Sequence, residues 1–104
     1  MKFKTINDKV EAIKRGNFSC VENVLYYSQK IATEKVKDLN IFLSLNEEAI
    51  NQAKEIDKRI KEKKDVGKLA GICFAVKSCI SVKGIETTCG SKVLEGYVSP
   101  YNAT

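Results

Sequence analysis

The chain has 104 residues, of which 43% are hydrophobic and 30% are charged, and its net charge at pH 7 is +5. This length allows one domain or part of a larger one, and the composition is that of a soluble globular protein rather than a disordered one. No stretch approaches the roughly 18 apolar residues of a membrane span, and no apolar signal segment follows the basic start, so we expect a cytoplasmic protein without membrane contact.

Two amphipathic segments predict helices at the start of the chain. The range 5–15 carries apolar residues at spacings of three and four, and the glycine that follows is a natural stop. Ser19 and Glu22 form a capping box, in which each side chain accepts a free backbone N–H of the helix start. A second apolar stripe follows this box, and we expect Asn40 to close the helix because asparagine tolerates the left-handed conformation.

The middle of the chain predicts strands on either side of a third helix. Residues 41–45 form a short apolar run that is typical of a buried strand. Asn46 is the expected N-cap of a helix whose apolar stripe continues to Ile60. The continuous apolar run at 69–76 predicts a strand covered on both faces. We therefore expect an α/β fold whose sheet is incomplete, because two strands alone would leave open edges.

Lys77 follows the apolar run directly and is the candidate for chemistry. An amine held away from water loses its proton more readily, and a neutral amine can act as general base toward a hydroxyl nucleophile. The competing interpretation is that the Lys77 side chain leaves the strand end for solvent or an ion pair, because lysines rarely stay buried.

The four cysteines, Cys20, Cys73, Cys79 and Cys89, do not follow a zinc pattern, since the chain has no Cys-x-x-Cys pair and no histidine. We expect no metal site and interpret the cysteines as buried thiols that behave as small hydrophobes. The basic run at 58–64 predicts a solvated helix end. Contact with RNA is the alternative for this run, although no aromatic residues are interleaved with it.

Four segments resemble landmarks of the amidase-signature family, in the family's order and spacing. Residues 69–77 resemble Leu-x-Gly-Ile-Pro-x-x-x-Lys, and residues 83–91 resemble the Lys-Gly-x-x-Thr-Thr-x-Gly-Ser segment that follows it. Residues 40–42 and 101–104 resemble Asn-Ala-Phe and Tyr-Asp-Ala-Thr. Several landmarks in a fixed order are far more specific than one motif. Within the family, these segments resemble those of the A subunits of tRNA-dependent amidotransferases.

The resemblance implies that residues 1–104 are the amino-terminal part of an amidase-signature domain. Residues 1–65 would be mainly helical with one short strand, and residues 66–104 would hold the strand and loop that carry the family lysine. Lys77 would be that catalytic lysine, which deprotonates a bridging serine that in turn activates a nucleophilic serine. Both serines are expected in a glycine- and serine-rich stretch after Thr104.

Such an A subunit takes glutamine as substrate and releases ammonia. The ammonia passes to a partner subunit, which amidates glutamate or aspartate mischarged on tRNA and where ATP and magnesium are expected. The resemblance thus implies partners in the rest of the A subunit and in the other amidotransferase subunits, contact with tRNA only through the complex, and no cofactor in this chain.

Two positions depart from the family pattern. The family lysine is normally followed by Asp-Asn, whereas Ser78 and Cys79 stand here, so a carboxylate beside the amine is missing. The family's Ile-Pro is Ile72 and Cys73 here, which removes a backbone constraint. Because the two serines are also absent, we expect the isolated chain to be inactive; the alternative function is a non-catalytic remnant or helical interaction module.

Overall fold

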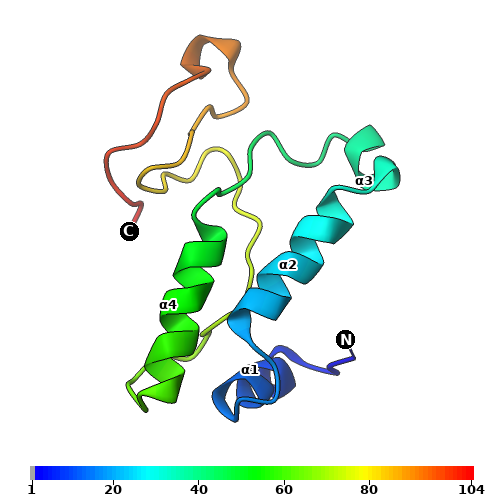
Figure 1. Cartoon of the computed structure of the whole chain (residues 1–104). Helices are drawn as coiled ribbons and strands as arrows, with labels where there is room; N and C mark the ends of the chain where they lie inside the picture. The colour runs from blue at the N-terminus through cyan, green and yellow to red at the C-terminus, as the bar shows by residue number, and fades with distance from the viewer. Residues whose placement is uncertain (1) are drawn as a thin grey trace. The chain divides into compact units, whose positions relative to one another are not determined.

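The computed structural model describes residues 2–104 and contains five helical elements (Figure 1). In chain order they are α1 (Ile6–Lys14), α2 (Cys20–Ile31), α3 (Glu34–Asp38), α4 (Ala49–Lys61) and the short 3₁₀ helix η1 (Lys92–Leu94). The chain divides into a helical unit that ends at Cys73 and a loop-rich unit from Phe74 to Thr104. Within the described residues, no helix is both long enough and apolar enough to cross a membrane.

The first two helices begin with reciprocal caps. Ser19 Oγ accepts the N–H of Glu22 at 3.0 Å, and the Glu22 carboxylate accepts the N–H of Ser19 at 2.8 Å, which confirms the predicted capping box. Thr5 and Asp8 make the same exchange at the start of α1, with both distances 3.1 Å. Gly16 follows α1 with φ +76° and ends it as predicted.

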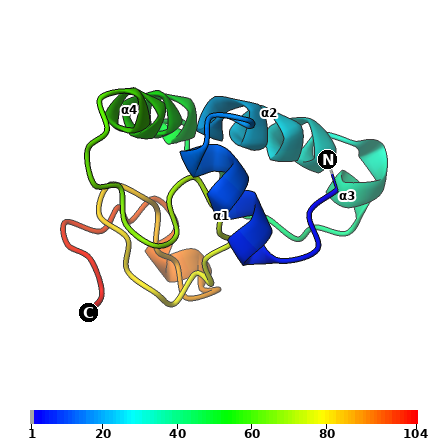
Figure 2. The same ribbon diagram turned by 90° about the horizontal axis from the view of Figure 1, so that it is seen from below.

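The core of the helical unit lies where α1, the start of α2 and α4 meet, as Figures 1 and 2 show. Ile13, Cys20 and Ala53 are its buried members, one from each helix. Asp57 of α4 adds a polar link, because its carboxylate accepts the backbone N–H of Cys20 at 2.8 Å and that of Val21 at 3.2 Å. These two amides belong to the first turn of α2, where no carbonyl of the helix itself is available. The half-buried residues that pack around this core are Phe18, Val21, Val24, Ile56 and Ile60.

The second predicted helix is interrupted in the structure. α2 ends at Ile31, and α3 starts anew at Glu34 after Thr33, whose backbone is extended at φ −68° and ψ 146°. The Thr33 hydroxyl donates to the Lys30 carbonyl at 2.8 Å, a local bond that competes with the continuing helix. Asn40 has φ +50°, so the predicted left-handed residue does close the segment.

α4 begins later than its sequence suggests. Asn46 was the expected N-cap, but Glu48 holds that position and the helix starts at Ala49. The Asn46 side-chain oxygen accepts the N–H of Glu48 at 3.1 Å, which makes a side-chain turn just ahead of the helix. The amide therefore organises the approach to α4 rather than its first turn.

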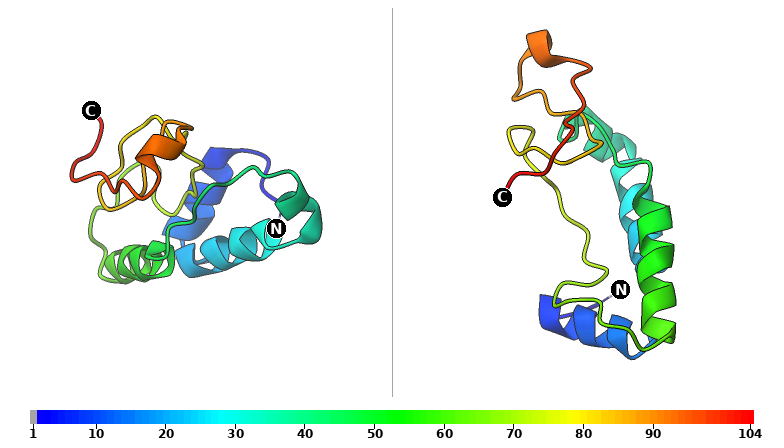
Figure 3. Two further views of the ribbon diagram at one scale, coloured as in Figure 1. Left: turned by 90° about the horizontal axis from the view of Figure 1, so that it is seen from above. Right: turned by 90° about the vertical axis from the view of Figure 1, so that its left-hand side faces the viewer.

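The two predicted strands, 41–45 and 69–76, are not strands in the part of the chain that the structure describes. The predicted amino-terminal helices are present, whereas residues 2–104 do not show the α/β class. Figure 3 shows the segment between α3 and α4 running without regular structure. Leu43 is 74% exposed and Phe74 is 65% exposed. A strand requires backbone hydrogen bonds to a neighbour, and these runs pair with none of residues 2–104. Among residues 2–104, β-type pairing occurs as an isolated antiparallel bridge between Glu86 and Val98.

Candidate functional site

Lys77 lies in irregular backbone, and its side chain is exposed to solvent. Its carbonyl accepts the N–H of Ile80 at 3.0 Å, which closes a turn across Ser78 and Cys79. The carbonyl of Ser78 accepts the N–H of Cys89 at 3.1 Å and ties this turn to the second landmark segment. The structure thus places Lys77 at a hydrogen-bonded turn, where the sequence predicted the end of a covered strand.

The second landmark segment contains a tight turn from Thr88 to Ser91. The N–H of Ser91 donates to the Thr88 carbonyl at 2.9 Å, and the two residues between them have positive φ, +52° at Cys89 and +72° at Gly90. Two consecutive left-handed residues define a type I′ turn. Gly90 adopts this conformation without strain, whereas Cys89 does so against the steric preference of an L-residue.

The landmark segment at 83–91 lies against residues 99–102, which include the start of the landmark segment at 101–104, within the loop-rich unit. Gly84 donates its N–H to the Ser99 carbonyl at 2.9 Å, and Ser99 donates its own to the Ile85 carbonyl at 3.2 Å. The Asn102 side-chain oxygen accepts the N–H of Lys83 at 2.8 Å. The sequence gives the order of these landmark segments, and the structure adds that they are in contact.

In the helical unit, Asn23 of α2 is the most thoroughly enclosed polar residue, with an exposed fraction of 0%. Its amide nitrogen donates to the Gly71 carbonyl at 2.7 Å and lies 3.5 Å from the Cys73 sulfur. Its amide oxygen accepts from Lys9 Nζ at 2.9 Å. No pattern in the sequence indicates that these four residues form a cluster.

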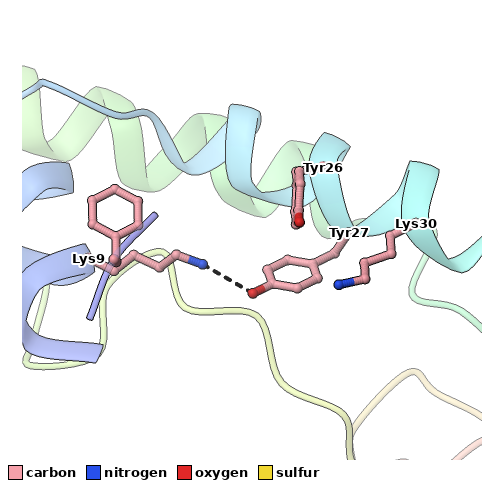
Figure 4. Close-up of a pocket in the computed structure, with 5 residues that line it drawn as sticks. Lys9, Tyr26, Tyr27 and Lys30 are labelled. Atoms are coloured by element: carbon pink, nitrogen blue, oxygen red, sulfur yellow. Dashed lines mark hydrogen bonds between the residues drawn. The ribbon is translucent and has the colours of Figure 1, made fainter. Parts of the chain in front are cut away.

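Two lysines and three aromatic rings line a shallow hollow beside this cluster, and Figure 4 shows Lys9 directed toward the Tyr27 hydroxyl. Lys9 Nζ donates to that hydroxyl at 3.2 Å and lies 4.8 Å from the centroid of the Tyr27 ring. Lys30 Nζ lies 5.8 Å from the centroid of the Tyr26 ring. The quadrupole of an aromatic ring attracts a nearby ammonium group. The partners of the two lysines in this hollow are therefore neutral aromatic side chains rather than carboxylates. Its lining residues are Phe3, Lys9, Tyr26, Tyr27 and Lys30.

The four cysteines are free thiols, and their environments differ. Burial, a hydrogen bond to Asp57 and the charge of that carboxylate raise the pKa of Cys20 to about 12. Loss of water around its sulfur also raises the pKa of Cys73, although the residue as a whole is exposed. The prediction of buried thiols is confirmed for Cys20 and wrong for Cys73, Cys79 and Cys89, which are exposed. Cys73 is exposed because the strand predicted around it does not form. Among residues 2–104, no group of three or more Cys, Asp or Glu side chains is placed to hold a metal ion.

Comparison with known proteins gives one consistent result. The family model described as Amidase matches residues 22–104. The A subunit of glutamyl-tRNA(Gln) amidotransferase from Bdellovibrio bacteriovorus is 40% identical over 102 residues, which cover 98% of this chain and 21% of that protein. The protein of the same name from Methanothermobacter thermautotrophicus is 42% identical over 105 residues, covering 100% of this chain and 23% of its own length. The mitochondrial A subunit of glutamyl-tRNA(Gln) amidotransferase from Rattus norvegicus is 41% identical over 102 residues, which cover 97% of this chain and 19% of that protein.

The chain therefore spans about a fifth of the length of the curated relatives it matches. No solved structure matches it.

Proposed function

The chain belongs to the amidase family, and we propose from this membership that it supplies the amino-terminal part of an amidase subunit that releases ammonia from glutamine for a tRNA-dependent amidotransferase. The observation that carries the proposal is the identity of about 40% over nearly the whole chain to proteins named as the A subunits of glutamyl-tRNA(Gln) amidotransferases. Its partners would be the remaining part of the A subunit and the other amidotransferase subunits, with tRNA reached only through the complex, in the cytoplasm.

We propose that the apolar run at 69–76, beyond the turn that Gly71 occupies, becomes a strand when the remainder of an amidase domain is present. Phe74 and Val76 support this, because they are 65% and 53% exposed and carry the side-chain types that strands favour. Their burial against a covering layer would be worth roughly 1.5–3 kcal/mol for each fully buried side chain. In this proposal, residues 1–65 remain mainly helical, and residues 66–104 contribute the strand and the loop to an α/β domain.

Within that domain, Lys77 would take a proton from a bridging serine, which would then activate a serine nucleophile toward the glutamine amide. Enclosure by the rest of the domain would remove water from the amine and favour its neutral, proton-accepting form. Ser78 and Cys79 stand where the family has Asp-Asn, so the proton acceptor would work without a neighbouring carboxylate. Since a base does little without its nucleophile, we expect the 104 residues alone to release no ammonia from glutamine.

A fusion protein tests this function. The 104 residues would replace the matched segment of the Bdellovibrio bacteriovorus relative, and ammonia release from glutamine would be measured. We expect activity in the fusion, and we expect Lys77→Met to lower it by at least about 1000-fold, as loss of one member of a catalytic unit does. Lys92→Met is the matched control, because Lys92 is also an exposed lysine of the loop-rich unit, and it should keep activity within about 2-fold.

The other outcomes separate the alternatives. A fusion that is inactive until Ser78→Asp and Cys79→Asn are introduced would favour the non-catalytic remnant, which these two departures from the family pattern support. Equal activities of the Lys77→Met and Lys92→Met fusions would refute the role of Lys77.

A further inference from the structure

The backbone at Gly71 is held by side chains of α1 and α2, a cluster that we call the Gly71 anchor: Ile13, Cys20, Asn23 and Gly71. Asn23 donates its amide N–H to the Gly71 carbonyl at 2.7 Å, the shortest bond that this buried amide makes. A Cβ atom placed on Gly71 would lie 2.6 Å from Cys20 Sγ and 2.8 Å from Ile13 Cδ1. The glycine backbone therefore packs directly against both helices, at a distance that no other residue allows.

The orientation of the Asn23 amide is determined by its partners. Lys9 Nζ can only donate, and it lies 2.9 Å from the amide oxygen, whereas the Gly71 carbonyl can only accept and lies 2.7 Å from the amide nitrogen. Exchanging the oxygen and nitrogen would place two donors together and two acceptors together. The amide thus has one orientation, and a charged donor holds it there.

Lys9 is itself fixed by neutral groups. Its ammonium group also donates to the Tyr27 hydroxyl at 3.2 Å, as Figure 4 shows, and lies 4.8 Å from the centroid of the Tyr27 ring. The result is a continuous chain of polar contacts from α1 through α2 to the backbone of Gly71, with every partner buried or half-buried. Such a connected and satisfied network holds its members in a single arrangement.

We propose that Asn23 is a positioning residue for the amine of Lys77, an inference that rests on the proposed function. The anchor fixes the backbone near the start of the apolar run at 69–76. Cys73, whose sulfur also lies beside Asn23, is the last residue of the helical unit. The link from Cys73 to Lys77 spans at most about 14 Å when fully extended. With one end of so short a link held, the backbone that leads to Lys77 starts from a fixed point, and release of that end would displace the amine from its serine partner.

Asn23→Asp in the fusion protein tests the proposal with the smallest change of shape. The carboxylate keeps an acceptor for Lys9 but loses the N–H that Gly71 requires, and it sets an oxygen against the Gly71 carbonyl. Asn51→Asp is the matched control, because the exposed Asn51 of α4 also donates its amide N–H, to Glu48 at 3.0 Å, outside the anchor. We expect Asn23→Asp to lower kcat by about 10- to 100-fold, as displacements of about 1 Å do, with KM for glutamine changed less than about 2-fold.

Two further measurements separate positioning from general loss of folding. In the Asn23→Asp fusion, the acidic limb of the pH–rate profile should move, because the surroundings of the amine change, whereas partial unfolding would lower the rate equally at every pH. Hydrogen–deuterium exchange should accelerate in residues 69–73 and remain as it was in α4.

Lys9→Gln provides a second variant that keeps a neutral donor for Asn23. It should give a smaller loss of kcat in the same direction, and a loss of zero for both variants would overturn the proposal.

The outcomes distinguish this inference from the function on which it rests. An active fusion in which Asn23→Asp and Asn51→Asp have the same kcat and the same pH–rate profile overturns the positioning role alone. A loss of rate that is uniform with pH and accompanied by a lower urea midpoint assigns Asn23 to stability only and also overturns it. A fusion without any activity overturns the proposed function and this inference together.

Discussion

Replacing Gly71 by alanine is expected to destabilise the helical unit more than any other single glycine substitution. Gly71 has φ +78°, a conformation that costs an L-residue roughly 1–2 kcal/mol. The added methyl group would lie 2.6 Å from Cys20 Sγ and 2.8 Å from Ile13 Cδ1, and overpacking of this kind costs about 1–3 kcal/mol. The two contributions predict a loss of about 2–5 kcal/mol, against a typical domain stability of about 5–15 kcal/mol.

Urea unfolding followed by the helical circular dichroism signal measures this loss. Gly67→Ala is the control that isolates the two contributions, because Gly67 has φ +79° and nothing within 4 Å of the position of a Cβ atom. Gly67→Ala should therefore lower the free energy of unfolding only by the cost of the left-handed backbone, about 1–2 kcal/mol. Adding Cys20→Ala to Gly71→Ala removes the closest contact, so the two substitutions should show a coupling free energy of about 1 kcal/mol or more.

Equal losses of free energy in Gly71→Ala and Gly67→Ala would refute the reasoning. So would strictly additive effects of Gly71→Ala and Cys20→Ala, because additivity would mean that the sulfur and the new methyl group never meet.

Three further predictions concern the polar contacts. Asp57→Asn should lower the free energy of unfolding by about 1–2 kcal/mol, since the carboxylate caps the N–H groups of Cys20 and Val21, and urea titration should detect it. The pKa of Cys20 is raised from 9.0 to about 12. The buried neutral thiol therefore contributes fully to stability below pH 9, and this contribution is lost as the pH rises toward 12, by at most about 1.4 kcal/mol per pH unit. The stability difference between the unmodified chain and Cys20→Ala should therefore shrink over that range, and a constant difference would contradict the assignment. Ser99→Ala removes a buried hydroxyl that donates to the Tyr101 carbonyl at 2.6 Å, and we expect a cost of about 1 kcal/mol and faster amide exchange around residue 99.

The helices could be predicted because their signals are local. Ser19 and Glu22 lie one turn apart and satisfy each other, whatever the rest of the chain does. The positive φ of Gly16 and Asn40 follows likewise from the residue type at a helix end. The reciprocal cap of Thr5 and Asp8 was missed because aspartate at the fourth position is a variant of the usual glutamate.

The candidate site was predicted only where it resembles a family landmark. Lys77 was identified, whereas Asn23 was not, because its importance comes from the Gly71 carbonyl, which lies 48 positions later in the chain. One signal was available: Asn23 follows Cys20 by three residues and precedes Tyr27 by four, so it lies on the buried stripe of α2. A polar residue on such a stripe requires a partner, but the pattern does not name that partner.

The amino-acid sequence alone determined the family and the presence of the helices, and it proposed Lys77 as the candidate base, because ordered landmarks, caps and apolar periodicity are properties of neighbouring residues. Only the tertiary structure decided that Asn23 holds Gly71, that Asp57 caps α2, and that the landmark segments around Gly84 and Asn102 are in contact. It also decided that the apolar runs at 41–45 and 69–76 are not strands among residues 2–104. The physical reason is the same in each case: a hydrogen bond between distant residues, and every strand, requires a partner that local sequence does not specify.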